Sequence, residues 1–371
     1  MSPLLPLSPS SFSPSPPLPS PLLPLSPSPP LLMSPSSLQL KFVRCGVCGA
    51  DNWHPYASGK DYEYDTSNDV FRMVRCKECG NVYLNPRPAE VEFSRIYPPN
   101  YYAYNYDTAV HPIARRAKDW LDAGKVKSWI APFETKRALR FLDVGCGNGR
   151  YLTMLHRLGL AKHQLFGVEM DATAIDRLNA EGYQGFYGRL EDIADELPEN
   201  YFDVIVLLQV LEHVANPAET VHCLGRLLRP GGRLILETPN TEGLDAKLFQ
   251  GGCWGGYHFP RHWNLFDRRT LTRLVTDAGL TVDRFKALPS HAFWILSYRH
   301  WLAHHQQRPR LASLFDPLQN VSLLSVFTGF DWLRSKMGVW TSNLQLIAVK
   351  PKSPPLSSSP ERPFGNLQHL S

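Results

Sequence analysis

The sequence predicts an α/β fold with a mostly parallel central sheet, preceded by a small cysteine-containing module. An apolar run that ends in a glycine-rich turn, FLDVGCGNGR, opens an alternation of strand-like and helical patterns from Arg140 to about Leu280. Such an alternation is typical of βαβ units, in which the strands are parallel. Upstream stand two C-x-x-C pairs. In a sheet of this kind, ligands bind at the carboxyl ends of the strands.

The glycine-rich turn predicts a site for a nucleotide-like ligand. Gly145, Gly147 and Gly149 occupy alternate positions between the first strand and a helical pattern, Tyr151–Leu158. Glycine lets the backbone approach a ligand closely, and the start of a helix offers N–H groups. The spacing excludes both the dinucleotide fingerprint G-x-G-x-x-G and the P-loop G-x-x-x-x-G-K-[ST].

Further elements follow in order. The short strand Gln164–Val168 ends at Glu169, about twenty residues after the glycines, where a carboxylate can accept hydrogen bonds from two ribose hydroxyls. A third apolar run ends in the turn Tyr187–Asp192, and Phe202–Leu208 (FDVIVLL) is almost entirely apolar, as expected of a parallel strand buried on both faces. The remaining elements are a helix that begins at Asn216-Pro217, a strand Arg233–Thr238, a helix Arg268–Ala278 and a last strand Leu344–Val349.

Three phrases together resemble the class I S-adenosylmethionine (SAM) methyltransferases. They are the pattern hhDhGxGxG, with Asp143 two residues before the first glycine, and the phrases LQVLEHVANP and LLRPGGRLILETPN. The resemblance implies a Rossmann-like class I methyltransferase sheet with an antiparallel last strand. It also implies SAM as cofactor, bound by Asp143, Gly145, Cys146, Gly147, Gly149, Glu169, Met170, Leu190, Glu191, Asp192 and Gln209. Which residue of Leu190 to Asp192 faces the adenine stays open. Glu212 and His213 are interpreted mainly as helix-cap and loop-packing residues.

The two C-x-x-C pairs predict a zinc ribbon. Cys45 and Cys48 form one pair, Cys76 and Cys79 the other, and residues 49–75 lie between them. Four thiolates on two tight turns make a closed tetrahedral site, which is structural when no His, carboxylate or open position is present. The alternative is free or disulfide-bonded cysteines; two disulfides would require an oxidising compartment, which no feature indicates. We therefore expect a structural Zn²⁺ and a ribbon that acts as a folding and substrate-lid element.

Two further segments point to a substrate site. A tyrosine-rich joint, YPPNYYAYNY, follows the second cysteine pair, and a loop with the sequence WGGYHFPRHWNLF follows the fifth strand. Tyrosines in a proline-rich joint suit a pocket wall. A histidine that titrates near neutrality suits the removal of a proton from a nucleophile, and an arginine can hold a phosphate or carboxylate.

A zinc ribbon, a tyrosine-rich joint and a class I domain in this order resemble bacterial methyltransferases with a zinc-binding amino-terminal domain, among them sugar C-methyltransferases. In those enzymes, joint tyrosines reach the substrate and a loop histidine is the general base. The resemblance implies His262 as base, Arg261 as a substrate-binding residue and Tyr102 as a catalytic residue, with Tyr101 and Tyr104 as further candidates. His258 is the weaker choice of base. The alternative interpretation is that His262 and Arg261 only anchor the loop.

The expected organisation has six parts: a disordered Pro/Ser/Leu-rich tail (1–40), the zinc ribbon (41–84), a tyrosine-rich connector with helices (85–138), the SAM-binding core (139–287), a helical insertion with the final strand (288–350) and a second disordered tail (351–371). The insertion is expected to cap the active site or form a homodimer contact, in preference to resting on a membrane surface, and His300, His304 and His305 are expected to be solvated. No apolar run is long enough to span a bilayer, and a cytoplasmic location is expected.

The predicted activity is transfer of a methyl group from SAM to an oxygen or carbon of a small molecule, such as a sugar nucleotide, a saccharide, or a lipid-linked or phenolic compound. The net charge of +5 is small and the basic residues are spread along the chain, so nucleic acid is not an expected partner. Two alternatives stay open: a protein or RNA methyltransferase whose ribbon docks the substrate, and a non-catalytic SAM-binding scaffold.

Overall fold

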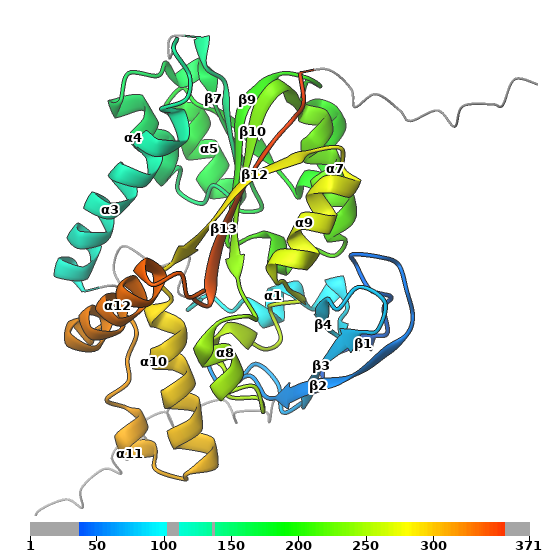
Figure 1. The fold of residues 1–371 in the computed structure, drawn as a ribbon, viewed down its shortest axis with the longest axis vertical. Helices are drawn as coiled ribbons and strands as arrows, with labels where there is room; N and C mark the ends of the chain where they lie inside the picture. The colour runs from blue at the N-terminus through cyan, green and yellow to red at the C-terminus, as the bar shows by residue number, and fades with distance from the viewer. Residues whose placement is uncertain (1–36, 102–110, 136–137, 353–371) are drawn as a thin grey trace, which may run out of the picture. The chain divides into compact units, whose positions relative to one another are not determined.

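The central sheet has seven strands, in the spatial order β12-β13-β10-β9-β6-β7-β8 (Figure 1). Their bounds, in that order, are Thr281–Leu288, Asn343–Val349, Leu228–Pro239, Phe202–Leu208, Phe141–Val144, Leu165–Glu169 and Gln184–Tyr187. β13 runs antiparallel to both of its neighbours, β10 and β12, while the other pairs are parallel. The mostly parallel sheet with an antiparallel last strand is therefore confirmed. This computed structural model describes residues 37–101, 111–135 and 138–352.

Helices cover both faces of this sheet. They are α3 (Pro112–Ile130), α4 (Arg150–Arg157) and α5 (Ala172–Ala180) on one face, and α7 (Pro217–Leu227) and α9 (Arg268–Asp277) on the other, with shorter turns η3 (Lys162–Gln164), α6 (Leu190–Ile193), η4 (Ala194–Glu196) and η5 (Leu211–His213) between strands. Successive strand residues enter opposite cores: Phe141 packs with α3 and α4, and Leu142 packs with α7 and α9. This alternation is what a strand buried on both faces requires.

The cysteine-containing module forms a second, four-stranded sheet in the order β11-β4-β3-β2. The bounds are Asn264–Leu265, Val82–Leu84, Phe71–Cys76 and Trp53–Gly59. β1 (Leu40–Lys41) pairs separately with β5 (Arg87–Pro88), and η1 (Glu90–Glu92) and α1 (Phe93–Ile96) follow. β11 belongs to the loop after β10 and pairs antiparallel with β4. One edge strand of the module's sheet is thus supplied by the loop that carries His262.

The region around the last strands holds one strand that the sequence analysis missed. β12 lies at the sheet edge, and Asp283, Arg284 and Lys286 interrupt its apolar pattern. Edge strands do not need the continuous apolar run by which central strands are found. Beyond β10 and β12 lie α8 (Leu244–Leu248), η6 (Gly255–Tyr257), α10 (His291–His300) with a π-helical turn (Trp301–His305), α11 (Pro309–Ala312) and α12 (Val321–Lys336).

Two expectations about the insertion can be compared with the fold. His300 is not solvated: it is 4% exposed, its ring lies 5.3 Å from that of Tyr62, and burial lowers its pKa to about 4. The expectation was wrong because α10 packs this side of the insertion against the ribbon loop. Within the described ranges, no helix has both the length and the apolar character needed to cross a membrane.

Candidate active site

The glycine turn follows β6 and has a backbone that only glycine adopts readily. Gly145 and Gly147 have φ values of +76° and +51°. A Cβ on Gly145 would lie 2.4 Å from a methyl group of Val210, while a Cβ on Gly147 would meet nothing within 4 Å. Gly145 is therefore required by packing, and the space at Gly147 leaves room for a ligand to approach the backbone.

Glu169, the last residue of β7, sits beside this turn. Its carboxylate accepts hydrogen bonds from the N–H of Gly147 at 2.9 Å and from the N–H of Met170 at 2.7 Å. Glu169 is half-buried and Met170 is exposed. A carboxylate fixed at the end of the second parallel strand is placed to accept hydrogen bonds from the hydroxyls of a ribose.

Asp143 and Cys146 are both buried beside the turn. Burial, together with the charge of Glu169, raises the pKa of Asp143 to about 7. One carboxylate oxygen of Asp143 has no hydrogen-bond partner in the structure. Cys146 packs its thiol in the core, donates its N–H to Val168 and accepts from Gly149. Cys146 therefore helps to pack and close the glycine turn, and its contact with the cofactor stays a prediction.

The turn after β8 contains the three candidates for contact with adenine. Leu190 is buried in the core, and Glu191 accepts a hydrogen bond from the Thr220 hydroxyl at 2.7 Å. Asp192 forms an exposed ion pair with Arg189 at 2.8 Å. The Asp192 side chain is thus turned to the surface, and a contact between Asp192 and the base would require this pair to break.

The loop after β9 connects the glycine turn with the substrate loop. Gln209 has a φ of +58°, and its amide nitrogen donates to the side chain of Asn343 at 3.1 Å. Val210 packs against Gly145, and the carbonyl of Glu212 accepts from the N–H of Trp263 at 2.8 Å. The loop residues 209–213 therefore carry the chain from the cofactor turn to the residues around His262.

Three histidines meet at this place. The ring centroids of His213 and His262 are 4.7 Å apart, those of His258 and His262 are 5.0 Å apart, and those of His213 and His258 are 6.4 Å apart. We call His213, His258 and His262 the histidine cluster. From the sequence, His213 was expected to have a packing role. It lies about fifty residues before His258 and His262 in the chain.

Each ring of the histidine cluster has its Nδ1 beside an acceptor. The acceptors are the Arg261 carbonyl for His213 at 3.1 Å, a Glu63 carboxylate oxygen for His258 at 2.6 Å and the Gly256 carbonyl for His262 at 2.8 Å. Because a carbonyl or carboxylate oxygen can only accept, Nδ1 carries the proton in His258 and His262, and Nε2 is then the basic atom of these two rings. Nδ1 of His213 also lies 2.9 Å from the Tyr97 hydroxyl, which can donate to it, so the contacts of His213 fit either tautomer.

Burial favours the neutral form of two of these rings. It lowers the pKa of His213 to about 3, and it lowers the pKa of His262 well below its ordinary value. The neighbouring Glu212 is fully buried, and burial raises the pKa of its carboxyl to about 8. At neutral pH the rings of His213 and His262 are therefore neutral and lie next to a neutral Glu212 carboxyl group.

Two acidic residues of the ribbon loop hold the substrate loop. Asp61 accepts two hydrogen bonds from the guanidinium of Arg261, at 2.9 and 3.1 Å, and neither side chain is exposed. Glu63 pairs with His258. The structure contradicts the prediction that Arg261 binds a substrate phosphate or carboxylate, because its guanidinium is enclosed and engaged by Asp61. No sequence signal indicated either partner, since about two hundred residues separate each pair.

Tyrosines line the other side of the cluster. The hydroxyl of Tyr97 lies 2.9 Å from Nδ1 of His213. The buried ring of Tyr101 contacts the rings of Tyr97, Tyr64 and His258, with centroids 5.1, 5.6 and 5.9 Å away. Tyr101 therefore lies where the tyrosine-rich joint was expected to contribute. Tyr102 and Tyr104 lie outside the described residues.

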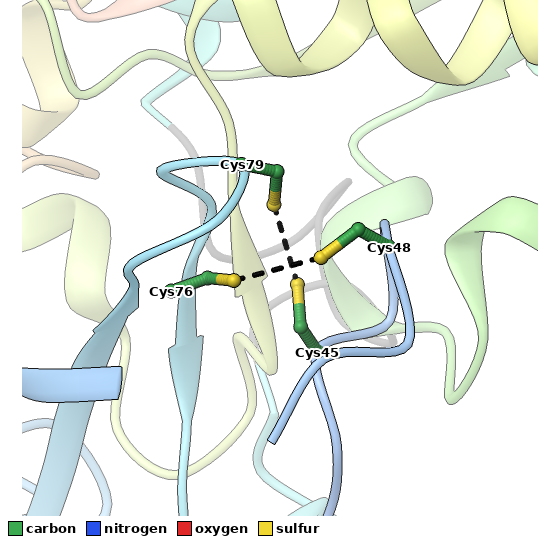
Figure 2. A group of neighbouring side chains, drawn as sticks. All are labelled: Cys45, Cys48, Cys76 and Cys79. Carbon is green, nitrogen blue, oxygen red and sulfur yellow. Dashed lines mark hydrogen bonds between the residues drawn. The ribbon is translucent and has the colours of Figure 1, made fainter. Parts of the chain in front are cut away.

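The four ribbon cysteines converge on one point, as Figure 2 shows. The sulfur atoms of Cys45 and Cys79 are 3.5 Å apart, as are those of Cys48 and Cys76, and all four lie within 4.8 Å of one another. All seven cysteines are free thiols. A tetrahedral zinc–thiolate site with bonds of about 2.3 Å has sulfur atoms about 3.8 Å apart.

Comparison with known proteins agrees with this geometry. A family profile described as a methyltransferase domain matches residues 105–284. The ubiquinone biosynthesis O-methyltransferase of Alkalilimnicola ehrlichii is 37% identical over 196 residues, which cover 47% of this chain and 75% of that protein. The protein of the same name from Pseudomonas syringae pv. tomato is 31% identical over 121 residues, covering 31% of this chain and 50% of that protein.

Among solved structures, a SAM dependent methyltransferase from Archaeoglobus fulgidus aligns with a TM-score of 0.40 and 16% identity, over 62% of this chain and 94% of that one. The family rests on the sequence relatives, one of which is matched over three quarters of its length. The chain therefore belongs to the class I SAM-dependent methyltransferases.

Proposed function

We propose that this enzyme methylates a hydroxyl oxygen of a small molecule, with the histidine cluster removing the proton. The observation that carries the proposal is that His262 and His258, whose rings are 5.0 Å apart, each have Nδ1 held by an acceptor and so have Nε2 as their basic atom. Relatives are named for O-methylation of a small molecule. A saccharide or sugar nucleotide, or a carbon nucleophile, stays a prediction from the resemblance, as does a cytoplasmic location.

Bound SAM would be held by Glu169 and the glycine turn, and it supplies an electrophilic methyl group on a sulfonium centre. The chain's own residues have to make the nucleophile and orient it. His262 accepts the hydroxyl proton at Nε2, and general-base help of this kind is typically worth about 10²- to 10⁴-fold in rate. Its burial disfavours a lasting imidazolium. The proton therefore has to leave His262 Nε2 again after the methyl group has been transferred, and Nδ1–H stays bonded to the Gly256 carbonyl throughout.

We also propose that Cys45, Cys48, Cys76 and Cys79 hold a structural Zn²⁺. The support is the convergence of four free thiols at distances that suit a closed thiolate site. The metal would take no part in methyl transfer. It would fix β2 and β3, the strands on either side of Asp61 and Glu63. It would also fix β4, which pairs with β11 next to Trp263.

Glu212, His213 and His262 also have the composition of a cation site, since their ligand atoms lie within 4.8 Å of one another. A cation there would need an ionised Glu212, whereas burial raises the pKa of this carboxyl to about 8. We therefore favour the general base. The two mechanisms differ in their dependence on added metal, which a methyl-transfer assay with a chelator and with added cation measures.

Replacing Glu169 by glutamine is expected to weaken binding of S-adenosylhomocysteine by about tenfold or more, because an ionised acceptor for two ribose hydroxyls becomes a neutral one. Isothermal titration calorimetry at neutral pH measures the affinity. Asp195→Asn, which changes an acid whose side chain is 99% exposed and which is outside the predicted cofactor set, is the matched control and should bind nearly as the wild type. Equal affinities of all three proteins would exclude Glu169 from the cofactor site.

Replacing His262 by alanine is expected to lower turnover about 10²- to 10⁴-fold while S-adenosylhomocysteine affinity is kept, because the base is lost and the cofactor turn is untouched. The assay follows transfer of a labelled methyl group from SAM to a panel of phenols, saccharides and sugar nucleotides. Wild type is assayed with a chelator and with added Mg²⁺ or Mn²⁺. Full activity of the variant, or strict dependence on the added cation, would refute the base.

A further inference from the structure

Helices α3 and α12 turn large apolar side chains outward. On α3 these are Ile113, Trp120 and Leu121, and on α12 they are Val326, Phe330, Trp332, Leu333 and Met337. Trp120 is 77% exposed and Met337 is 71% exposed. The core needs none of them, because α3 packs inward through Val126, Trp129 and Ile130. Exposed apolar residues that gather on two neighbouring elements mark a contact surface.

Four of the exposed apolar residues of α12 form one stripe. Val326, Phe330, Leu333 and Met337 stand at positions i, i+4, i+7 and i+11, which lie on one side of an α-helix, and Trp332 lies beside this stripe. Asp331 is buried on the other side, and the guanidinium of Arg334 lies 5.4 Å from the Phe330 ring at the edge of the stripe. On α3, Ile113 and Trp120 repeat the spacing i and i+7, and Leu121 lies next to them. Each helix therefore has an apolar face that no part of the described chain covers.

The two faces belong to neighbouring parts of the molecule. The N–H of His111, the residue before α3, donates to the carbonyl of Leu318, just before α12, at 3.0 Å. Figure 1 shows α12 close to the lower end of α3. The starts of the two helices therefore lie at one corner of the molecule, within reach of a single extended surface.

Exposed cations lie on both helices and on the segment before α12, and the acids there are already engaged. Arg116 and Lys127 are on α3, Lys336 is on α12, and Arg308 and Arg310 are at α11; all five are exposed. In the same segments Asp119 pairs with Arg150, Asp122 pairs with Lys118, Asp331 is buried against Ser290, and Asp316 accepts from the N–H groups of Leu318 and Gln319. The two helices thus combine exposed apolar side chains with exposed positive charge.

We propose that α3 and α12 form a surface that rests on an anionic lipid bilayer. Tryptophan prefers the boundary between the headgroups and the hydrocarbon, and basic residues beside an apolar helix face are attracted to anionic lipids. The sequence analysis favoured a capping role or a homodimer contact for this insertion. In a two-fold dimer the same cations would face each other across the interface, so the charge favours a lipid surface over a second copy.

The test is co-sedimentation of the full chain with vesicles. Protein is expected to sediment with phosphatidylcholine vesicles that contain phosphatidylglycerol, and not with phosphatidylcholine alone, and added salt should release it. Trp120→Ser and Leu333→Ser should each weaken binding severalfold, because an inserted apolar group is lost. Arg310→Glu and Lys336→Glu should weaken it at least about fivefold each, the effect of one basic residue near such a surface.

The matched control is Phe42→Ser, because Phe42 is 76% exposed and lies in the ribbon module. It should sediment as the wild type does, and circular dichroism melting should show that all variants are folded. Absence of sedimentation with the anionic vesicles, or equal losses in Phe42→Ser and Trp120→Ser, would overturn the proposal. A dimer in analytical ultracentrifugation that Leu333→Ser dissociates, without vesicle binding, would assign the face to a second copy.

Discussion

Replacing Asp61 by asparagine is expected to lower the free energy of unfolding by about 3–5 kcal/mol, because it leaves the guanidinium of Arg261 buried without a counter-charge. Neither side chain of this pair is exposed. Burial alone would raise the pKa of Asp61, but the hydrogen bonds and charge of Arg261 hold it below its ordinary value. The carboxylate is thus ionised at neutral pH, and its contribution is lost only as the pH falls below about 4. Urea unfolding at neutral pH measures the difference.

Two control variants separate the charge from the other roles of Asp61. Asp61 also caps the turn, accepting from the N–H of Tyr64 with one oxygen and from the N–H of Thr66 with the other, and asparagine keeps one of these two acceptors. The double variant Asp61→Asn, Arg261→Met removes both charges and should recover much of the loss. Asp192→Asn breaks an exposed pair and should cost less than about 1 kcal/mol. A loss in Asp61→Asn no larger than in Asp192→Asn would mean that the buried pair does not hold the substrate loop.

The sequence predicts the central sheet well because its signals are local. The parallel strands β6, β7 and β9 are short and mostly apolar, and capped helices follow two of them: Asp171 caps α5 after β7, and Asn216 caps α7 after β9. The cofactor turn is found in the same way, because the φ values of Gly145 and Gly147 require glycine. Such features need no knowledge of distant contacts.

The substrate side could not be predicted to the same depth, because it depends on long-range contacts. His262 and His258 were identified from their loop, but His213 joins them only through the path of the chain after β9. Glu63 and Asp61 reach the loop from the ribbon, and no periodicity or motif connects residues so far apart in the chain. Arg261 was misassigned for the same reason: the sequence shows a cation but not the carboxylate that encloses it.

The pairing of β4 with β11 changes how the ribbon is understood. A lid would contact the active site only through side chains, and could open without altering the loop. Here the strand that follows His262 and Trp263 completes the ribbon's sheet, and Trp263 also donates a backbone hydrogen bond to Glu212. The order of the histidine cluster should therefore depend on the order of the ribbon, and the proposed metal site becomes a means to test that dependence.

Replacing Cys79 by serine, or removing metal with a chelator, is expected to release the substrate loop while the central sheet stays folded. Structural zinc supplies about 10–16 kcal/mol of apparent binding free energy in small zinc-finger peptides, so its loss should unfold the ribbon. Hydrogen–deuterium exchange should then quicken in residues 258–266 as well as in β2 to β4, because β11 loses its partner strand. Amides of β6 and β9, in the sheet centre, should remain protected.

Elemental analysis of the purified chain should first give one zinc per molecule, and Cys223→Ser is the matched control, because Cys223 is buried on α7 and is no part of the cysteine group. S-adenosylhomocysteine affinity should survive metal removal, since Glu169 and the glycine turn belong to the central sheet. Faster exchange limited to the ribbon, with residues 258–266 unchanged, would show that the substrate loop is ordered without it. Loss of cofactor binding together with the ribbon would instead show that the two sheets unfold as one unit. The cofactor site would then depend on the ribbon as the histidine cluster does.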